Sequence, residues 1–279
     1  MTKLTIRKTG LVLLGLVFIL TPATPALAVT PASTQPLMSR PMFMSRGHSD
    51  SSATGAALTQ STSENWSGYA ATAANNSFSS VSSNWVQPTL NCASVTTSYS
   101  AYWVGIDGYS DQTVEQIGTE ANCVNGQPQS YTWYEMYPQN PSEVLVRLSV
   151  APGNVISASV TYNPPVTVSR DHRRVTSSSS FTLTLADITT GASYSTTQAA
   201  YLAANRSSAE VIAEAPYSNG ILPLANFGVA NFSSSKVNGL ALGNAAGLEA
   251  VTMDDPHGMI ATPSTLDATK ENFSITWTP

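Results

Sequence analysis

The sequence has little charge, little histidine and little cysteine. Only 10% of the 279 residues are Asp, Glu, Lys or Arg, and there are three histidines and two cysteines. The patterns HExxH, GxSxG and CxxC do not occur, which argues against the zinc, serine and dithiol chemistries that use them. A Ser-His-Asp triad needs a partly buried histidine, whereas His172 lies in the charged run Arg170–Arg174, typical of a solvated turn.

Another histidine, His257, follows Asp254, Asp255 and Pro256. Aspartate followed by proline is typical of a turn, so we interpret this segment as a turn in preference to a metal site. We therefore expect no metal ion and no other cofactor.

Long apolar runs are also scarce. The run Leu11–Leu20 is shorter than the roughly 20 residues that span a bilayer; basic residues at Lys3, Arg7 and Lys8 precede it, and an Ala-Leu-Ala site ending at Ala28 follows. This order is typical of a secretory signal peptide, with a retained membrane anchor as the alternative. We predict a signal peptide over residues 1–28, a secreted extracellular protein and no membrane contact after its removal.

Residues 29–63 mix Pro, Ser, Thr, Met and Gly without helical or strand periodicity, and we interpret them as a pro-segment or disordered leader. From Ser61 onward there are sixteen acidic and seven basic residues, a formal charge of −9. A weakly basic leader would mask an acidic cleft, although a plain flexible linker fits equally well. The acidic balance without a basic patch argues against a nucleic-acid partner, and we expect a monomer.

Two cysteines, Cys92 and Cys123, lie outside the expected strands and flank a motif-rich region. In an exported chain an even pair indicates one disulfide, with two buried free thiols as the alternative. We expect the two to be bonded.

The rest of the chain, residues 64–279, fits one all-β domain. Apolar and polar residues alternate in short runs that are rich in β-branched and aromatic residues and are separated by turn residues. This pattern predicts a sandwich or barrel. The expected strands are 98–104, 130–137, 143–150 turning through Pro152-Gly153-Asn154 into 155–162, 181–186 turning at Gly191 into 192–195, and 272–277.

Three expected strands place carboxylates on one face, because residues two apart in a strand point the same way. Trp133, Glu135 and Tyr137 share a face; so do Trp103, Gly105 and Asp107; so do Glu210 and Glu214. The inner face of a sandwich is apolar, so these are outward faces, and aromatic side chains grouped with acids there indicate a concave cleft.

These motifs resemble the eqolisin glutamic peptidases in order and spacing. The resemblance covers most of the chain from about Glu64 to Phe227 and is thin in the last fifty residues. It rests on an opening Asn65-Trp66-Ser67-Gly68 and on Tyr102–Gly108 (YWVGIDG), Gln116–Gly118 (QIG), Trp133–Pro138 (WYEMYP) and Ala209–Glu214 (AEVIAE).

The resemblance implies a concanavalin-like β-sandwich of two bent antiparallel sheets with a concave substrate cleft, and an endopeptidase active in acid on polypeptides. It also implies a catalytic dyad of Gln116 and Glu210. By the same mapping, further residues line or support the cleft: Trp66, Trp103, Asp107, Glu120, Trp133, Glu135 and Tyr137.

Two positions depart from the family pattern. Glu120 stands where familiar fungal members have Asp, and Glu115 stands where an apolar residue is usual, so we expect Glu115 to face the opposite side or solvent. In the expected mechanism Glu210 is the general base that activates water, and the Gln116 amide stabilises the oxyanion. The alternatives are a lectin-like carbohydrate-binding sandwich, with tryptophans stacking on sugars, and a two-carboxylate glycosidase using Glu135 and Glu210.

Overall fold

The computed structural model describes residues 59–140, 142–170, 173–200 and 203–279. The predicted signal peptide and most of the predicted leader lie outside this range, as does His172. The strand β1 (Thr59–Ser63) pairs in parallel with β16 (Leu248–Asp254), which attaches the last residues of the predicted leader segment to the domain. None of the described residues forms a helix with the length and apolar character to cross a membrane.

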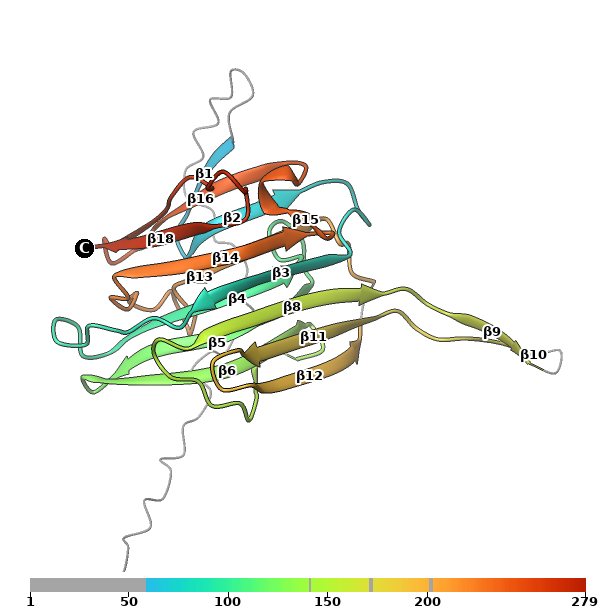
Figure 1. Cartoon of the computed structure of the whole chain (residues 1–279), viewed down its shortest axis with the longest axis horizontal. Coiled ribbons are helices and arrows are strands. Elements are labelled where there is room, and N and C mark those ends of the chain that lie inside the picture. The colour runs from blue at the N-terminus through green and yellow to red at the C-terminus, as the bar shows by residue number, and fades with distance from the viewer. Residues whose placement is uncertain (1–58, 141, 171–172, 201–202) are drawn as a thin grey trace, which may run out of the picture. The chain divides into compact units, whose positions relative to one another are not determined.

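The domain is built from two layers of antiparallel strands (Figure 1), which confirms the predicted all-β sandwich. One layer carries β3, β8 and β11, and these pack against β4, β5 and β13 of the other. A single hydrogen-bonded order runs through both layers: β12-β11-β8-β3-β14-β18-β17-β16-β2-β13-β4-β5-β6-β7. The bounds of its strands, beyond β16, are β2 Trp66–Thr72, β3 Ser80–Val86, β4 Ser98–Ile106, β5 Val114–Val124, β6 Gln127–Tyr137, β7 Val144–Leu145, β8 Val155–Asn163, β11 Ser180–Asp187, β12 Ala192–Ala199, β13 Ser208–Glu214, β14 Val229–Val237, β17 Ile260–Pro263 and β18 Phe273–Thr278. Two short elements, β15 (Leu240–Ala241) and a 3₁₀ turn (Leu242–Asn244), follow β14.

Alternating side chains of both layers fill the space between them. Along β11 every second residue is buried, and Leu183 lies opposite Val160 of β8. Val104 and Val211 contribute to the same buried cluster from the other layer. Each such side chain stabilises the fold by roughly 1.5–3 kcal/mol when it leaves water, so the sandwich is held mainly by this interlayer core.

Of the two predicted hairpins, the structure contains one. β11 and β12 pair through a turn at residues 187–191, which contains Gly191 as predicted; this glycine has φ +78°. The prediction that residues 143–150 form a hairpin with residues 155–162 is wrong. Both edges of β8 are occupied, by β3 and β11, so the preceding segment pairs elsewhere and forms the short edge strand β7 beside β6.

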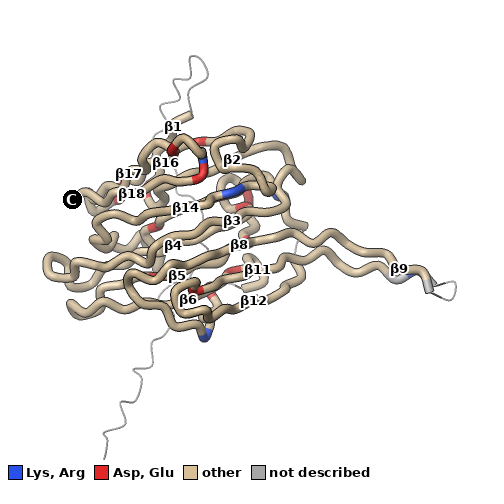
Figure 2. Tube along the Cα trace, viewed as in Figure 1, with Lys and Arg blue, Asp and Glu red and all other residues tan. Residues whose placement is uncertain are grey.

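A two-stranded ribbon, β9 (Thr167–Arg170) with β10 (Arg173–Thr176), continues from the ends of β8 and β11 beyond the main sheet (Figure 1). It carries most of the charged run Arg170–Arg174. Charged residues are sparse along the rest of the described chain (Figure 2).

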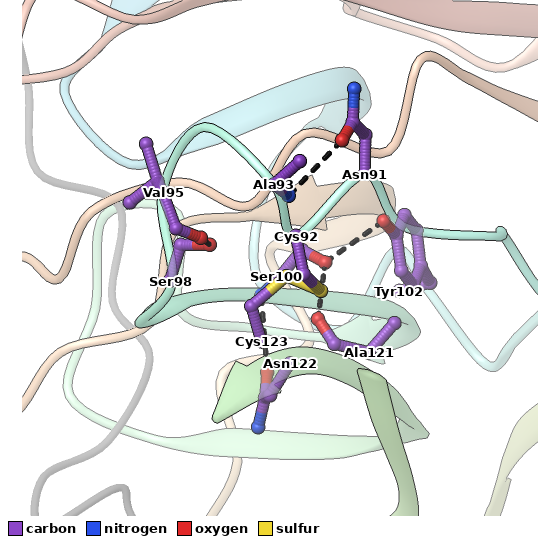
Figure 3. The surroundings of a disulfide bond; sticks show 10 residues. All are labelled: Asn91, Cys92, Ala93, Val95, Ser98, Ser100, Tyr102, Ala121, Asn122 and Cys123. Carbon is purple, nitrogen blue, oxygen red and sulfur yellow. Dashed lines mark hydrogen bonds between the residues drawn. A yellow bond between two sulfur atoms is a disulfide. The ribbon is translucent and has the colours of Figure 1, made fainter. Parts of the chain in front are cut away.

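The disulfide between Cys92 and Cys123 is present as predicted (Figure 3). Cys92 lies in the loop after β3, whereas Cys123 lies within β5 and not in a loop as expected. Beside the bridge, the Ser100 hydroxyl donates to the carbonyl oxygen of Ala121 at 2.7 Å. The bridge therefore ties the loop that follows β3 to the strand that carries Gln116.

Candidate active site

The predicted site residues lie on the face of one layer that points away from the other layer. The strands β2, β13, β4, β5 and β6 are paired antiparallel, so residues opposite one another lie side by side and point the same way. Tyr102 and Val104 of β4 belong to the interlayer core, whereas Trp66, Trp103 and Trp133 form a separate buried cluster. The predicted outward face is thus confirmed.

Three parallel rows cross this face. The first, here called the dyad row, contains Ala70, Glu210, Gly105, Gln116 and Glu135. The second, the aromatic row, contains Gly68, Ile212, Trp103, Gly118 and Trp133. The third, the acid row, contains Trp66, Glu214, Ala101, Glu120 and Tyr131. The polar rows are separated by one row of indoles and glycines.

Gln116 and Glu210 occupy the same row two strands apart, with Gly105 between them. Adjacent strands are about 4.8 Å apart, which puts the two backbones roughly 10 Å from each other. A Cβ atom at Gly105 would lie 2.9 Å from the Trp103 ring and 3.1 Å from Cβ of Gln116. Only glycine fits here, because the Trp103 ring occupies the space that a side chain would fill.

Glu135 fixes the orientation of Gln116. The Gln116 Nε2 donates to Oε2 of Glu135 at 2.7 Å, and both side chains are fully buried. This bond directs the amide nitrogen towards β6 and uses one of its two N–H groups. The amide oxygen of Gln116 accepts no hydrogen bond from the described residues, so it is available to a water molecule or a substrate.

Glu210 is also fully buried. Within the described part of the chain, no donor lies at hydrogen-bonding distance and angle from its carboxyl oxygens. Burial raises the pKa of Glu210 well above its usual value; the nearby Ser208 hydroxyl lowers it, and the charges of Asp107, Asp111 and Glu115 raise it further. The carboxyl group thus retains a proton more strongly than an exposed glutamate does.

Asp107 acts on the segment that leads into β13. It directly follows β4 and has φ +66°. Its carboxylate oxygens accept hydrogen bonds from the backbone amides of Arg206 and Ser207, each at 2.7 Å. The Thr113 hydroxyl adds a third bond at 3.2 Å. Burial and the adjacent Asp111 raise the pKa of Asp107 to about 7. Because Ser207 immediately precedes β13, this clamp fixes the start of the strand that carries Glu210.

Glu120 lies in the acid row, four residues from Gln116. It accepts a hydrogen bond from Asn122, and it pairs with Glu143 of the segment between β6 and β7. Burial raises the pKa of Glu143 well above its usual value, and the Glu120 carboxyl raises it further. Glu143 was not among the predicted site residues, because it began the expected strand 143–150, which was expected to pair with 155–162.

Glu214 was expected to share a face with Glu210 but was not among the predicted cleft residues. Its oxygens accept the Trp103 indole N–H at 2.8 Å and the Asn65 amide at 3.1 Å. Trp103 in turn packs edge-to-face on Trp66, with ring centroids 4.9 Å apart. The spacing of four residues between Glu210 and Glu214 predicted the face of Glu214, but did not predict that Trp103 and Asn65 are its partners.

The remaining predicted residues divide by position. Trp133 is buried opposite Gly118 in the aromatic row, and Tyr137 ends β6 on the Glu135 face, partly exposed. Glu115 is buried and lies opposite Ile106 and Met136 of the interlayer core face, which confirms that it faces away from Gln116.

Asp255 accepts hydrogen bonds from the backbone amides of His257 and Met259, at 2.8 and 2.9 Å, and so forms the predicted turn. No group of three metal-ligand side chains occurs among the described residues.

The chain is thus a β-sandwich that carries carboxyl and amide side chains in one row on the outward face of one layer, beside buried tryptophans. A profile of the Peptidase A4 family matches residues 64–277, and the chain belongs to this family. Family and fold identify the protein as a glutamic endopeptidase that acts on polypeptides. The comparison with curated proteins returned no match.

Solved structures share the fold. Scytalido-glutamic peptidase with a transition-state analogue inhibitor superposes with a TM-score of 0.59 at 21% identity, over 77% of this chain and 98% of that one. A second structure of that enzyme, with a peptide-based analogue, gives 0.55 at 23% identity over the same shares. SCP-B, described as an eqolisin in complex with the tripeptide Ala-Ile-His, gives 0.50 at 21% identity, also over 77% and 98%.

Proposed function

We propose that this glutamic endopeptidase is secreted, works at acid pH, and hydrolyses peptide bonds through Glu210 and Gln116. The observation that carries the proposal is their shared row, in which the residue between them, Gly105, has no side chain. Both groups are buried on one face, beside indoles that exclude solvent. A reacting carbonyl in this interval would meet a carboxyl on one side and an amide on the other.

Peptide hydrolysis needs an activated water, a stabilised oxyanion and a protonated leaving amine. Glu210 removes a proton from the water and returns it to the amine nitrogen. The second N–H of Gln116 donates to the oxyanion, while its amide oxygen holds the water. Glu135 keeps the amide in that orientation through the 2.7 Å bond.

The raised pKa of Glu210 places a condition on this mechanism. A general base must be ionised, and burial opposes ionisation of this carboxyl. Water must therefore reach Glu210 before it acts, since hydration removes the largest cause of the raised pKa. The opening of the face to solvent and substrate is thus part of the proposed catalytic cycle.

Secretion is supported by the predicted signal peptide over residues 1–28 and by the Cys92–Cys123 disulfide, which is typical of oxidising compartments. The acid optimum is supported by the low charge of the chain and by the buried carboxyl groups, which are most easily accommodated when protonated.

The structure disfavours the two alternatives. A lectin-like module needs exposed ring faces, whereas Trp66, Trp103 and Trp133 are fully buried. A glycosidase needs its two carboxyl groups about 5–9.5 Å apart. Glu135 and Glu210 lie three strands apart, with backbones about 14 Å from each other, and Gln116 stands between them bonded to Glu135.

The test incubates the processed enzyme, produced from the full chain, with an acid-denatured protein substrate at about pH 3–4. A β-glucan is the second substrate, and cleavage of each is measured. Glu210→Gln should abolish cleavage and Gln116→Ala should lower it by about 10²–10³-fold, both with normal circular dichroism. Glu271→Gln, at the Lys236 surface ion pair, is the matched control and should retain activity. Full activity in the Glu210→Gln variant would remove Glu210 from the mechanism, and cleavage of the glucan alone would favour a glycosidase.

A further inference from the structure

A cavity lies at the free edge of the site layer, where β6 meets β7 and the segment that follows. It is separate from the dyad row and is lined by side chains from both segments, here called the edge cavity: Ser130, Tyr131, Thr132, Leu145, Val146, Arg147, Leu148 and Ser149. β7 is the last strand in the sheet order, so this cavity borders the outer end of the three rows.

Hydrogen bonds fix the far wall of the edge cavity. The Val146 amide donates to the carbonyl oxygen of Thr132 at 2.8 Å. The Thr132 hydroxyl lies 3.0 Å from the carbonyl oxygen of Val146 and 2.8 Å from that of Leu148. Since Leu145 pairs with Trp133, the same register places Arg147 opposite Tyr131. Leu145 and Arg147 therefore extend the aromatic row and the acid row by one strand, on the face of the dyad.

Arg147 brings a positive charge to an acidic domain. Its side chain is exposed, and within the described residues it has no ion pair or hydrogen bond, unlike Arg206, which donates to Asn76, and Lys236, which pairs with Glu271. The acid nearest in register, Glu120 opposite Tyr131, is buried and bonded to Asn122. The guanidinium is thus available to an external carboxylate.

The cavity also offers apolar contact and lies at a defined distance from the reaction. Leu145 is 39% exposed and stands beside the partly exposed Tyr131, which suits the methylene groups of a side chain. Tyr131 precedes Glu135 by four residues on the same face of β6. At about 3.4 Å per residue this is roughly 14 Å along the strands. Arg147 also lies three strands across the sheet from Gly105, roughly another 14 Å, so the cavity is about 20 Å from the middle of the dyad, the span of about six residues of extended peptide.

We propose that the edge cavity is a substrate subsite that binds an acidic side chain of the polypeptide about six residues from the scissile bond, with Arg147 pairing with its carboxylate. This inference rests on the proposed function, because it needs a peptide held at the dyad row. Arg147 is then a specificity residue: it selects among substrates and takes no part in bond cleavage.

The test uses a set of peptides that share one cleavage site and carry either Glu or Gln at each position from three to eight residues on either side of it. The specificity constant kcat/KM is measured at about pH 5, where a peptide Glu with a reference pKa of ~4.3 is mostly ionised, and at about pH 3, where it is mostly neutral. We expect Glu to be preferred over Gln at one position by about two- to fivefold at pH 5, the range for an exposed ion pair, and the preference to vanish at pH 3.

Variants separate this charge effect from other causes. Arg147→Gln should abolish the preference at pH 5 while cleaving the Gln peptides as the wild type does, and Arg147→Lys should retain part of it. Lys270→Gln, which removes a distant surface cation bonded to Asn244, should leave it unchanged. A wild-type enzyme that cleaves all peptides without a Glu preference, or an Arg147→Gln variant that keeps one, overturns the subsite and leaves the proposed function intact. Failure of the wild type to cleave any peptide overturns both.

Discussion

Gly105 is the residue on which the geometry of the dyad row depends. A methyl group there would lie within 3.1 Å of both Trp103 and Gln116, so one of them must move. We predict that Gly105→Ala lowers kcat/KM by at least tenfold, while overpacking costs about 1–3 kcal/mol of folding free energy. Peptidase assays and urea unfolding of the same preparation measure the two effects. Wild-type activity would show that the interval between Gln116 and Glu210 is not used.

Asp107 stabilises the domain and the site through the same backbone bonds. Asp107→Asn keeps the size of the side chain but turns an amide N–H group towards the backbone donors of Arg206 or Ser207. We predict a loss of about 1–3 kcal/mol, the cost of an unsatisfied buried donor, together with a lower kcat because β13 is less firmly held. Asp254→Asn, at an exposed position, should change neither the unfolding midpoint nor kcat.

The sequence could predict which residues share the outward face, because alternation in a strand is set by local geometry. It could not predict how they are joined across strands. The bond from Gln116 to Glu135 depends on the register of β5 with β6, and the pairing of Glu120 with Glu143 depends on the path of a loop. The bonds from Glu214 to Trp103 and Asn65 depend on three separate segments meeting.

Among the elements, β5 is held at its far end by the disulfide, seven residues beyond Gln116. A bridge across a sequence separation of 31 residues is expected to stabilise the fold by about 3–4 kcal/mol. We predict that the double variant Cys92→Ala, Cys123→Ala loses about this much in denaturant unfolding but keeps kcat within about threefold, because Gln116 is oriented locally by Glu135. A much larger fall in kcat in the folded variant would mean that the bridge also positions the dyad.

The pairing of strands was predictable only where the chain reverses within a few residues. The turn at Gly191 joins β11 to β12 as the local signals indicated. The segment 143–150 alternates in the same way, yet only Val144–Leu145 forms a strand. Alternation indicates that one side of a segment is buried, but it does not indicate which strand the segment pairs with. Both edges of β8 are already paired, with β3 and with β11.

Across the whole domain, buried carboxyl groups outnumber the cations near them. Burial is the largest cause of a raised pKa at each of Asp107, Glu115, Glu120, Glu143, Glu210 and Glu214. One ion pair, Lys236 with Glu271 at 3.7 Å, occurs among the described residues, and it is at the surface. The domain therefore has little charge pairing to lose in acid and several buried acids to ionise as the pH rises.

The dependence of stability on pH follows in sign from these shifts. A carboxyl group whose pKa is higher in the folded than in the unfolded chain binds more protons when folded, so the free energy of unfolding falls as pH rises. The effect begins near the unfolded value, about 4, and for Asp107 is complete above its folded value of about 7. Glu143 and Glu214, whose pKa values burial also raises, contribute in the same direction. We predict maximal stability in acid and a continuous decrease from about pH 4 upward, measured by urea unfolding between pH 3 and 8. Glu143→Gln removes one such group and should make the decrease shallower, whereas stability that rises towards neutral pH would contradict a fold in which these carboxyls are buried and protonated.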